Sequence, residues 1–311
     1  MQPIINYIKH PANLCDSLVK HFGQWLPDST YIKLHYRFQM GRKLNLKKPK
    51  TFQEKLQWLK LHDHNPEYGK MVDKVLVKDY VTKKIGDQYV IPLIAVWEKP
   101  ENIEWDKLPE RFVLKTNHGG GNTGVVICRD KSKLDKNKAI EKLNESLSHD
   151  VYKKHREWPY KNIKKCVFAE EFVEAAPGEP DLPDYKFFCF NGVVKALFVA
   201  TERQKVGEDV KFDYFDADYN HLPLRQGHDH AKKIPPKPKS FEEMKRIATE
   251  LSRGIPHVRV DLYEVNGKPM FGELTFCHFG GMVPFEPEEW DYKFGEWLVL
   301  PSKNEKNTLS H

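Results

Sequence analysis

The chain has 311 residues, of which 40% are hydrophobic and 30% charged, and its formal net charge is +6. This balance is typical of a globular protein with two or three subdomains, and it excludes a disordered chain. No apolar run approaches membrane-spanning length, no secretory signal is evident, and the five scattered cysteines form no CxxC pair, so we expect a protein of the reducing cytoplasm.

Residues 1–65 are basic and are predicted to be largely helical. Their apolar side chains recur at near-helical intervals, with lysines and histidines between them. This pattern fits a helix that packs on the body of the protein, and it also fits a helix that rests on a membrane surface. Both interpretations stay open for the apolar residues Leu14, Leu18, Val19, Phe22, Trp25 and Leu26.

Three further elements are predicted before residue 100. Thr51 and Glu54 match a capping box, which is a typical start for a helix that would run to Leu61. Apolar residues at helical spacing predict a second helix over residues 73–85. The β-rich run over residues 89–97 predicts one buried strand or two short ones.

A glycine-rich stretch over residues 112–127 predicts a β-hairpin whose turn is replaced by a flexible loop. Glycine lets backbone N–H groups approach an anion closely, and Lys115 at the strand end adds positive charge. The stretch therefore predicts a phosphate-binding loop, although a mobile surface loop has the same composition. No Gly-Lys-Ser/Thr sequence follows, so it is not a P-loop. The loop glycines are Gly119, Gly120, Gly121 and Gly124.

The second half of the chain combines helices with several β-rich runs. Helices are predicted over residues 133–147 and 241–253, and a strand over residues 166–173 ends in acidic residues. Asn191-Gly192 and Asn266-Gly267 each lie between two β-rich runs, and Asn-Gly supplies the positive φ angles of a tight hairpin turn. The sequence therefore predicts a mixed α+β fold with largely antiparallel sheets.

The hairpin around Asn266-Gly267 carries a group of polar residues. Arg259 and Asp261 are two positions apart on its first strand, and Glu273 and Thr275 lie on its second strand. Strand alternation places all four side chains on one face. Two carboxylates that face one another repel unless a cation lies between them, and Mg²⁺ accepts carboxylates together with phosphate oxygens. The hairpin therefore predicts a magnesium site, with a solvated acidic edge as the alternative.

Three other motifs contain candidate functional residues. His228 and His230 have the spacing of a metal-binding pair, but no third ligand is evident, and we expect a solvated loop. Cys277 and His278 follow the polar hairpin, and we interpret them as packing or substrate-contacting residues. Arg203 is a candidate for contact with a phosphate or an anionic glycan.

Taken in order, these elements resemble the ATP-grasp superfamily, and more narrowly the teichuronopeptide-biosynthesis (TupA-like) ATP-grasp family. The resemblance covers roughly residues 35–297. It rests on the lysine strand with its glycine-rich loop, the acid-ended strand and the polar hairpin. The sequence motifs that carry the resemblance include Leu44-Asn-Leu-Lys-Lys-Pro-Lys-Thr-Phe52, Asp184-Tyr-Lys-Phe-Phe-Cys-Phe-Asn-Gly192, Val258-Arg-Val-Asp-Leu262, Gly272-Glu-Leu-Thr-Phe276 and Glu288-Glu-Trp-Asp-Tyr292.

The resemblance implies an α+β ATP-grasp fold, in which two lobes with antiparallel sheets clasp ATP. The implied divisions are an N-terminal helical and basic region (1–65), an N-terminal α/β lobe (66–111), a small lobe with the glycine-rich loop (112–173), a large lobe with the metal hairpin (174–300) and a tail (301–311).

The resemblance also implies roles for individual residues. Lys74 and Lys115 would hold ATP phosphates, and Glu170 would reach the exocyclic amine of adenine. Mg²⁺ would be bound by Asp261, Glu273 and Thr275, although Thr275 stands where the superfamily more often has asparagine. The residues implied to contact ATP are Lys74, Lys115, His118, Gly119, Gly120, Gly121, Glu170, Glu171, Phe172, Val173, Asp184 and Lys186.

The implied activity is an ATP- and Mg²⁺-dependent ligation of a carboxylate and an amine through an acylphosphate. Arg259 and Lys186 would be catalytic, Arg259 by stabilising the transition state, and Gly280 and Gly281 would offer N–H groups to the acceptor. The implied substrates are an acidic glycan or polysaccharide precursor and an amine, with no nucleic acid. The N-terminal region could contact the inner face of the membrane. The alternatives are an ATP-dependent kinase of a sugar hydroxyl and a non-catalytic binding module.

Overall fold

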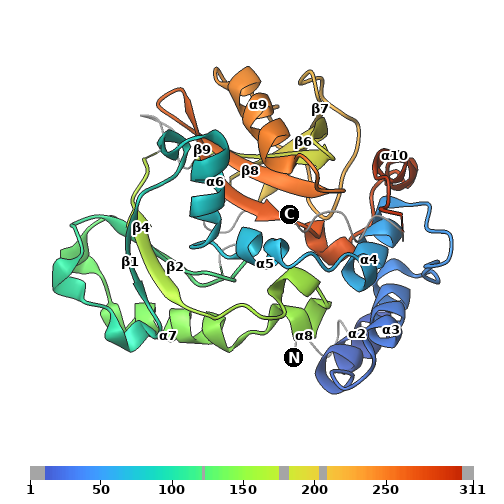
Figure 1. The fold of residues 1–311 in the computed structure, drawn as a ribbon, viewed down its shortest axis with the longest axis horizontal. Helices are drawn as coiled ribbons and strands as arrows, with labels where there is room; N and C mark the ends of the chain where they lie inside the picture. The colour runs from blue at the N-terminus through green and yellow to red at the C-terminus, as the bar shows by residue number, and fades with distance from the viewer. Residues whose placement is uncertain (1–10, 121–122, 175–181, 203–208, 303–311) are drawn as a thin grey trace.

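The structure is a computed structural model that describes residues 11–120, 123–174, 182–202 and 209–302. It contains a four-stranded sheet and a five-stranded sheet, both antiparallel, with helices around them. In Figure 1 the smaller sheet lies on the left and the larger sheet lies at the top. The mixed α+β fold with antiparallel sheets, predicted from the sequence, is confirmed.

The smaller sheet has the strand order β1-β4-β2-β3. The predicted glycine-rich hairpin is confirmed, because β2 and β3 pair with Lys115 opposite Val125. Helix α7 (Lys136–Ser148) packs on one face of the sheet, where Phe112 and Leu114 are buried. The strands are β1 (Leu93–Trp97), β2 (Phe112–Thr116), β3 (Val125–Cys128) and β4 (Val167–Glu171).

The larger sheet has the strand order β7-β6-β5-β8-β9. Both predicted Asn-Gly hairpins are confirmed: the φ angles are 47° and 81° at Asn191 and Gly192, and 51° and 75° at Asn266 and Gly267. A type I′ turn requires such positive φ angles at its two central residues. The strands are β5 (Asp184–Phe190), β6 (Val193–Thr201), β7 (Lys211–Asp216), β8 (Val258–Val265) and β9 (Lys268–Thr275).

Helices cover both faces of the larger sheet. On one face, two helices bury a core that contains Phe187 and Phe215. On the other face, Phe52 packs edge-on against Phe188 within a second core. The helices are α6 (Val77–Ile85) and α9 (Phe241–Ser252) on the first face, and α4 (Phe52–His62) and α10 (Glu289–Trp297) on the second.

The N-terminal helices α2 (Pro11–Phe22) and α3 (Asp28–Met40) pack against each other at the lower right of Figure 1. Val19 and Leu26 contact a small core around Tyr31. Four apolar side chains between Leu14 and Trp25 face solvent instead. No helix in the described part of the chain is long and apolar enough to cross a membrane. The exposed fractions are 43% for Leu14, 48% for Leu18, 64% for Phe22 and 82% for Trp25.

The helix predicted over residues 73–85 begins later than expected. Helix α5 (Glu67–Val72) ends before Asp73, and α6 starts only at Val77. Oδ1 of Asp73 accepts hydrogen bonds from the N–H groups of Val75 and Leu76, at 2.9 and 3.2 Å. Such local side-chain bonds favour a turn over a continuous helix, so Lys74 lies on a turn.

The strand predicted over residues 89–97 is shorter and less buried than expected. It contains only β1, in which Leu93 and Val96 are exposed. The capping box at Thr51 and Glu54 is confirmed, and α8 (Val151–His155) was not predicted. Short 3₁₀ turns occur at Asp87–Tyr89, Pro100–Asn102, Trp105–Lys107, Lys131–Lys133, Trp158–Tyr160 and His278–Gly281.

Candidate functional site

A cavity of about 730 Å³ lies between the two sheets. This volume falls within the roughly 300–1,000 Å³ that is usual for small-molecule sites. Strands β2, β3 and β4 form one wall, and strands of the larger sheet form the opposite wall. Helix α8 and the residues that follow it close one end.

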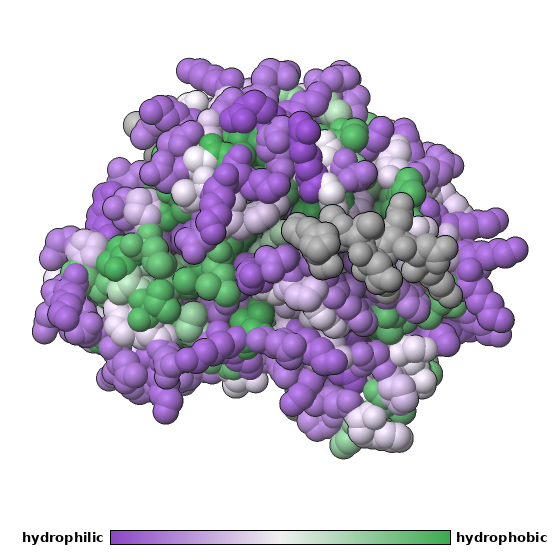
Figure 2. Space-filling view, in the orientation of Figure 1, coloured by the Kyte–Doolittle hydropathy of each residue, from purple (hydrophilic) through white to green (hydrophobic). Residues whose placement is uncertain are grey.

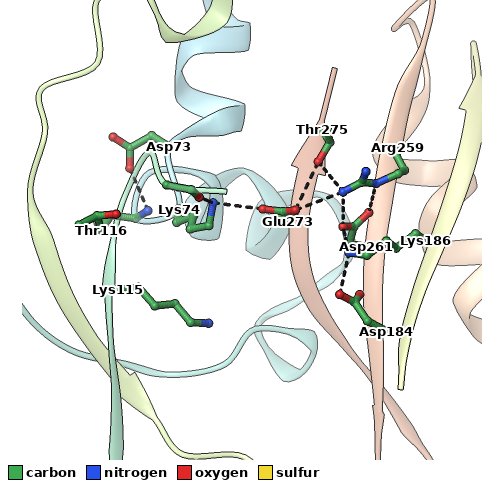
Figure 3. A network of polar contacts seen from close by, with 12 residues as sticks. Asp73, Lys74, Lys115, Thr116, Asp184, Lys186, Arg259, Asp261, Glu273 and Thr275 are labelled. Atoms are coloured by element: carbon green, nitrogen blue, oxygen red, sulfur yellow. Dashed lines mark hydrogen bonds and ion pairs between the residues drawn. The ribbon is translucent and has the colours of Figure 1, made fainter. Parts of the chain in front are cut away.

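Lys115 is the main charged group on the wall of the smaller sheet. Strand alternation turns Phe112 and Leu114 into the core, so Val113 and Lys115 face the cavity. Nζ of Lys115 forms an ion pair with Oε1 of Glu170 on the neighbouring strand β4. Figure 3 shows Lys115 extending from its strand toward the space between the sheets.

Glu170 is held between two lysines. Its Oε2 atom lies 3.0 Å from Nζ of Lys78 on α6, so both carboxylate oxygens are engaged. Burial raises the pKa of Glu170, but Lys115 and Lys78 more than offset burial and bring the pKa below its usual value. The expected contact between Glu170 and adenine stays a prediction. Lys78 was missed in the sequence, because only the tertiary fold distinguishes it from the other lysines of its helix.

Lys74 connects the two walls of the cavity. Its Nζ atom donates to the carbonyl oxygen of Gly119 at 2.6 Å and lies 3.1 Å from Oε2 of Glu273. The turn that carries Lys74 is fixed by Asn117, whose Nδ2 donates to Oδ2 of Asp73 at 2.7 Å and whose carbonyl accepts from the Lys74 N–H at 2.9 Å. In Figure 3, Glu273 lies between Lys74 on one side and Arg259 on the other.

The glycines of the loop differ in what surrounds them. A Cβ atom at Gly119 would lie 2.6 Å from Oγ1 of Thr116, and one at Gly124 would lie 2.3 Å from Oγ of Ser146. Gly124 also has a φ angle of 69°. A Cβ at Gly120 would meet no atom within 4 Å among the described residues. Gly119 and Gly124 are therefore required by packing, whereas Gly120 is not.

The polar hairpin forms, and a register shift of one residue between Asp261 and Leu262 brings its four polar residues to one face. Asp261 pairs with Glu273 across the β8–β9 ladder, and Arg259 pairs with Thr275. The expected repulsion between the two carboxylates is relieved by Arg259, whose guanidinium lies 2.7 Å from Asp261 and 3.2 Å from Glu273. Nη2 of Arg259 also donates to Oγ1 of Thr275 at 3.0 Å. A protein cation therefore already lies where the sequence suggested that a cation was needed.

Lys186 adds a second positive charge to this face. It lies 2.6 Å from Asp184 on its own strand and forms an ion pair with Asp261 on the neighbouring strand. Burial raises the pKa of Glu273, but Lys74, Lys186 and Arg259 more than offset burial, so the pKa lies well below its usual range. Glu273 is therefore ionised at neutral pH, as a metal ligand or an ion-pair partner needs to be.

An apolar surface lies beside the charged groups. Val125 and Ile127 on β3 line the cavity together with Phe172, which follows β4. Arg111 lies over the Phe172 ring, with its guanidinium carbon 4.8 Å from the ring centroid. Figure 2 shows a hydrophobic patch over the smaller sheet, on the left of the view. A flat apolar ligand group could pack against this surface.

The end of the cavity near α8 contains Glu157, which the sequence did not single out, together with Cys277 and His278, which it did. Glu157 lines the cavity and is buried, and this burial raises its pKa to about 7, although Lys60 and Arg259 act in the opposite direction. Nδ1 of His278 lies 2.7 Å from Nη1 of Arg259. Burial raises the pKa of the Cys277 thiol far above its usual value, which is unsuitable for a nucleophile. No local pattern marks Glu157, because its neighbours come from distant segments.

Most of the predicted site residues line the cavity. Asp261 is buried behind Arg259 and Lys186 and does not line it, while Gly121 and Arg203 lie outside the described residues. The predicted residues that line the cavity are Lys74, Lys115, His118, Gly119, Gly120, Glu170, Glu171, Phe172, Val173, Asp184, Lys186, Arg259, Glu273 and Thr275.

Three predicted residues have surroundings that the sequence did not indicate. Burial lowers the pKa of His118 to about 4, so its imidazole is neutral at physiological pH and does not attract phosphate as a cation. The N–H of Gly280 donates to the carbonyl of Cys277 at 2.9 Å and is not available to an acceptor. His230 lies beside Asp213 and His221, which corrects the expectation of a solvated loop. His228 instead packs against Phe212.

The polar hairpin fits Mg²⁺ by its donor atoms. Glu273 and Thr275 line the cavity, and Oγ1 of Thr275 lies 3.4 Å from Oε1 of Glu273. Mg²⁺ prefers oxygen ligands from one or two carboxylates, completed by substrate phosphates and water. Asp261 lies behind these residues, with its oxygens engaged by Arg259 and Lys186. Glu273 and Thr275 are therefore the ligands that the cavity presents directly.

Comparison with known protein families gives a match that covers most of the chain. The family model for the TupA-like ATP-grasp matches residues 54–299. No curated protein matches the chain.

Several solved structures are similar at low sequence identity. D-alanine–D-alanine ligase from Bacillus anthracis, in complex with ATP, is 17% identical over 67% of this chain and 55% of its own, with a TM-score of 0.38. D-alanyl-alanine synthetase A from Vibrio cholerae is 14% identical over 74% of this chain and 63% of its own, with a TM-score of 0.41. In both cases the match spans less than two thirds of the other protein.

Proposed function

Because the chain belongs to the TupA-like ATP-grasp family, we propose that it is an ATP-dependent ligase that joins a carboxylate to an amine through an acylphosphate. The proposed co-substrate is ATP with Mg²⁺. The proposed carboxylate belongs to an acidic surface glycan or its precursor, such as a uronic acid or a glutamyl chain. The proposed amine is an amino acid or an amino sugar.

The convergence of charged groups on one cavity carries this proposal. Lys74 and Lys115 approach from the side of the smaller sheet, and Lys186 and Arg259 approach from the larger sheet. Four cations around one cavity suit a polyphosphate, and the carboxylate of Glu273 between them suits a divalent cation bound to that polyphosphate. The apolar surface of the smaller sheet provides a place for the adenine ring.

In the first step, an oxygen of the substrate carboxylate attacks the γ-phosphorus of ATP. The bond from the γ-phosphorus to the bridging oxygen breaks, and ADP leaves with the electron pair. Arg259 and Lys186 stabilise the negative charge that spreads over the transferring phosphoryl group, and Lys74 orients it from the opposite wall. When bound, Mg²⁺ supplies further charge neutralisation at the phosphate oxygens.

In the second step, the amine nitrogen attacks the acyl carbon, and the bond from this carbon to the phosphate oxygen breaks. Inorganic phosphate leaves with the electron pair, and the amine loses a proton as the amide forms. Glu157 is suited to accept this proton, because it lines the cavity and its pKa is about 7. Excluding water from the cavity protects the acylphosphate from hydrolysis.

The proposal also includes peripheral contact with the inner face of a membrane. Helix α2 exposes Leu14, Leu18 and Phe22 on its outer side, and Lys20 lies in the same helix. Exposed apolar side chains with basic neighbours are typical of helices that lie in a membrane interface. A lipid-linked glycan precursor would be reached from such a surface.

The reaction is tested by measuring ADP release from the purified protein, with acidic glycans and amines supplied in combination. We expect release only when ATP, Mg²⁺, a carboxylate and an amine are all present, and we expect Asp261→Asn to reduce it, because Asp261 holds Arg259 and Lys186 in place. A phosphorylated product that needs no amine would indicate a kinase, and ATP binding without turnover would indicate a binding module. Mass spectrometry of the surface polysaccharide, with and without the protein, would identify a lost amide-linked substituent.

A further inference from the structure

A second polar cluster lies on strand β7, and the proposed ligase reaction does not use it. Asp213 is on the strand, His221 follows the turn after it, and His230 returns along the edge of the sheet. Nε2 of His221 lies 3.1 Å from Oδ1 of Asp213, and Nδ1 of His230 lies 3.3 Å from the same oxygen. The three donor atoms all lie within 4.8 Å of one another.

This cluster is separated from the large cavity by the sheet itself. Phe212 lines the cavity, and strand alternation turns the next residue, Asp213, to the opposite face. Phe215 confirms this assignment, because it shares the face of Asp213 and is buried in the core beneath α9. In Figure 1, β7 lies at the top of the molecule, at the outer edge of the larger sheet.

Among the described residues, no lysine or arginine neutralises the charge of Asp213. The residue is completely buried, and in the described part of the chain its ion-pair partners are the two histidines alone. Its Oδ2 atom accepts a hydrogen bond from the N–H of Ala231 at 3.1 Å. Nδ1 of His230 is also buried, and it has no hydrogen-bond partner among the described residues. A completely buried carboxylate is unfavourable unless a cation lies beside it, and two imidazole nitrogens directed at one of its oxygens leave a protonated histidine or a bound metal ion to supply that charge.

We propose that Asp213, His221 and His230 bind a divalent transition-metal ion of the Zn²⁺ class. Two imidazole nitrogens and one carboxylate oxygen are the ligand set that such ions prefer. Zn²⁺ bonds of about 2.0–2.1 Å in tetrahedral geometry place neighbouring ligand atoms about 3.3 Å apart. The observed separations of 3.1 and 3.3 Å match this spacing. The side chains of His221 and His230 are 28% and 30% exposed, so an ion can enter from solvent.

Hydrogen bonds around the three proposed ligands also support metal binding. The Ala231 N–H fixes the orientation of the carboxylate, as hydrogen bonds to metal-ligating carboxylates usually do. The same segment is joined to the edge strand by a hydrogen bond from the N–H of Phe212 to the carbonyl of Asp229, at 3.0 Å. A bound ion would therefore fasten this segment to the sheet. His228, two residues before His230, lines the large cavity, so the ion would also stabilise part of the cavity wall.

The test is Zn²⁺ binding by the untagged, full-length protein after treatment with a chelator. Zn²⁺ is titrated in competition with a chromogenic chelator, and the melting temperature is recorded with and without Zn²⁺. We expect one tightly bound ion per chain and a higher melting temperature when it binds, because ligands that bind only the folded state stabilise it. Mg²⁺ should not substitute, because it prefers oxygen ligands.

The variants His221→Gln and His230→Asn separate ligation from hydrogen bonding. Each side-chain amide can place a nitrogen near the position of the lost ring nitrogen, so Asp213 keeps a donor while the metal loses an imidazole. We expect each variant to fold and to bind Zn²⁺ more weakly by a factor of about 100 or more, since loss of an outer-shell partner alone costs about 10–100-fold. His228→Asn is the matched control and should retain wild-type Zn²⁺ affinity.

Two results would overturn the proposal. One is a wild-type Zn²⁺ affinity no greater than that of the His221→Gln, His230→Asn double variant. The other is an equal loss of affinity in His228→Asn. Either result would make the cluster a hydrogen-bonded structural group. Circular dichroism and melting of the metal-free variants show whether they fold, and Asp213→Asn provides a further variant that removes only the charge.

Discussion

Lys74 lies 3.1 Å from Glu273, and the same ammonium donates to the carbonyl of Gly119 at 2.6 Å. One side chain thereby connects the glycine-rich loop of the smaller sheet to the polar hairpin of the larger sheet. In the proposed reaction, phosphate oxygens would replace part of this contact, and Glu273 would then be available to hold Mg²⁺, which would supply charge neutralisation at the phosphates. Lys74 therefore links nucleotide binding to the position of the loop.

Replacing Lys74 by glutamine should weaken ATP binding by roughly 10–100-fold, because a hydrogen bond to a charged group contributes about 1.5–3 kcal/mol. Isothermal titration with ATP and Mg²⁺ measures the change. Lys70→Gln is the control, since Lys70 is exposed and pairs only with Glu67 among the described residues. Similar affinities in the two variants would contradict the role of Lys74.

Two glycine substitutions of equal size should have different effects. Gly120→Val should lower turnover at least about 10-fold while changing stability by less than about 0.5 kcal/mol, because the added Cβ meets no described neighbour and the loop must still close over phosphate. Gly124→Val should lower the melting temperature as well, because the residue has a positive φ angle and a Cβ would collide with Ser146. Equal losses of turnover and melting temperature in Gly120→Val would assign the loop a structural role.

Glu170→Gln should destabilise the protein by about 3 kcal/mol, because it removes the buried counter-ion of two half-buried lysines. The folded-state pKa of Glu170 lies below its usual value, so its contribution is present at neutral pH and is lost as the pH falls through that pKa. The difference from wild type in denaturant unfolding should therefore shrink in acid. Glu171→Gln, on the exposed side of the same strand, should change stability little, and a pH-independent deficit in Glu170→Gln would contradict the assignment.

Ionisation of Glu157 should make the folded protein less stable as the pH rises, which is opposite to the effect of Glu170. Its pKa is raised from 4.5 to about 7, so its neutral form favours the folded state below pH 4.5, and this contribution is lost as the pH rises to about 7. Glu157→Gln cannot ionise and should gain about 3 kcal/mol relative to wild type between pH 4.5 and 7, at about 1.36 kcal/mol per unit of pKa. Urea unfolding of both proteins across this range measures the gain. Parallel curves would show that Glu157 has an ordinary pKa.

Membrane contact should depend on the exposed side of α2. Phe22→Asp should lower binding to anionic lipid vesicles about 10-fold, because burying such a side chain contributes about 1.5–3 kcal/mol. Vesicle co-sedimentation measures the change, and Val299→Asp is the control, since Val299 is 77% exposed near the other end of the chain. If wild type does not sediment with vesicles, or if both variants lose binding equally, the exposed side of α2 is not a membrane-binding surface.

The sequence by itself determined the local elements whose signals lie within a few residues. Asn266-Gly267 predicted the β8–β9 turn and the pairing beside it, from Val265 with Lys268 to Leu262 with Phe271. Only the structure shows the irregularity between Asp261 and Leu262, which shifts the register by one residue and so places Glu273 opposite Asp261 and Thr275 opposite Arg259. The pairing of β2 with β3 was also predicted, from the two short β-rich runs on either side of the glycine-rich loop. Hydrogen bonding within a tight turn and the two-residue period of a strand are local properties, so they can be read from adjacent residues.

Only the tertiary structure decided which distant residues meet. Lys78 reaches Glu170 over 92 positions of sequence, and Glu157 acquires a raised pKa because other segments bury it. The H-x-H motif was expected to be a solvated loop, but His228 packs on Phe212 and His230 lies beside Asp213 and His221. Burial and pairwise electrostatics depend on how the sheets and helices pack in three dimensions, and no pattern of neighbouring residues specifies that packing.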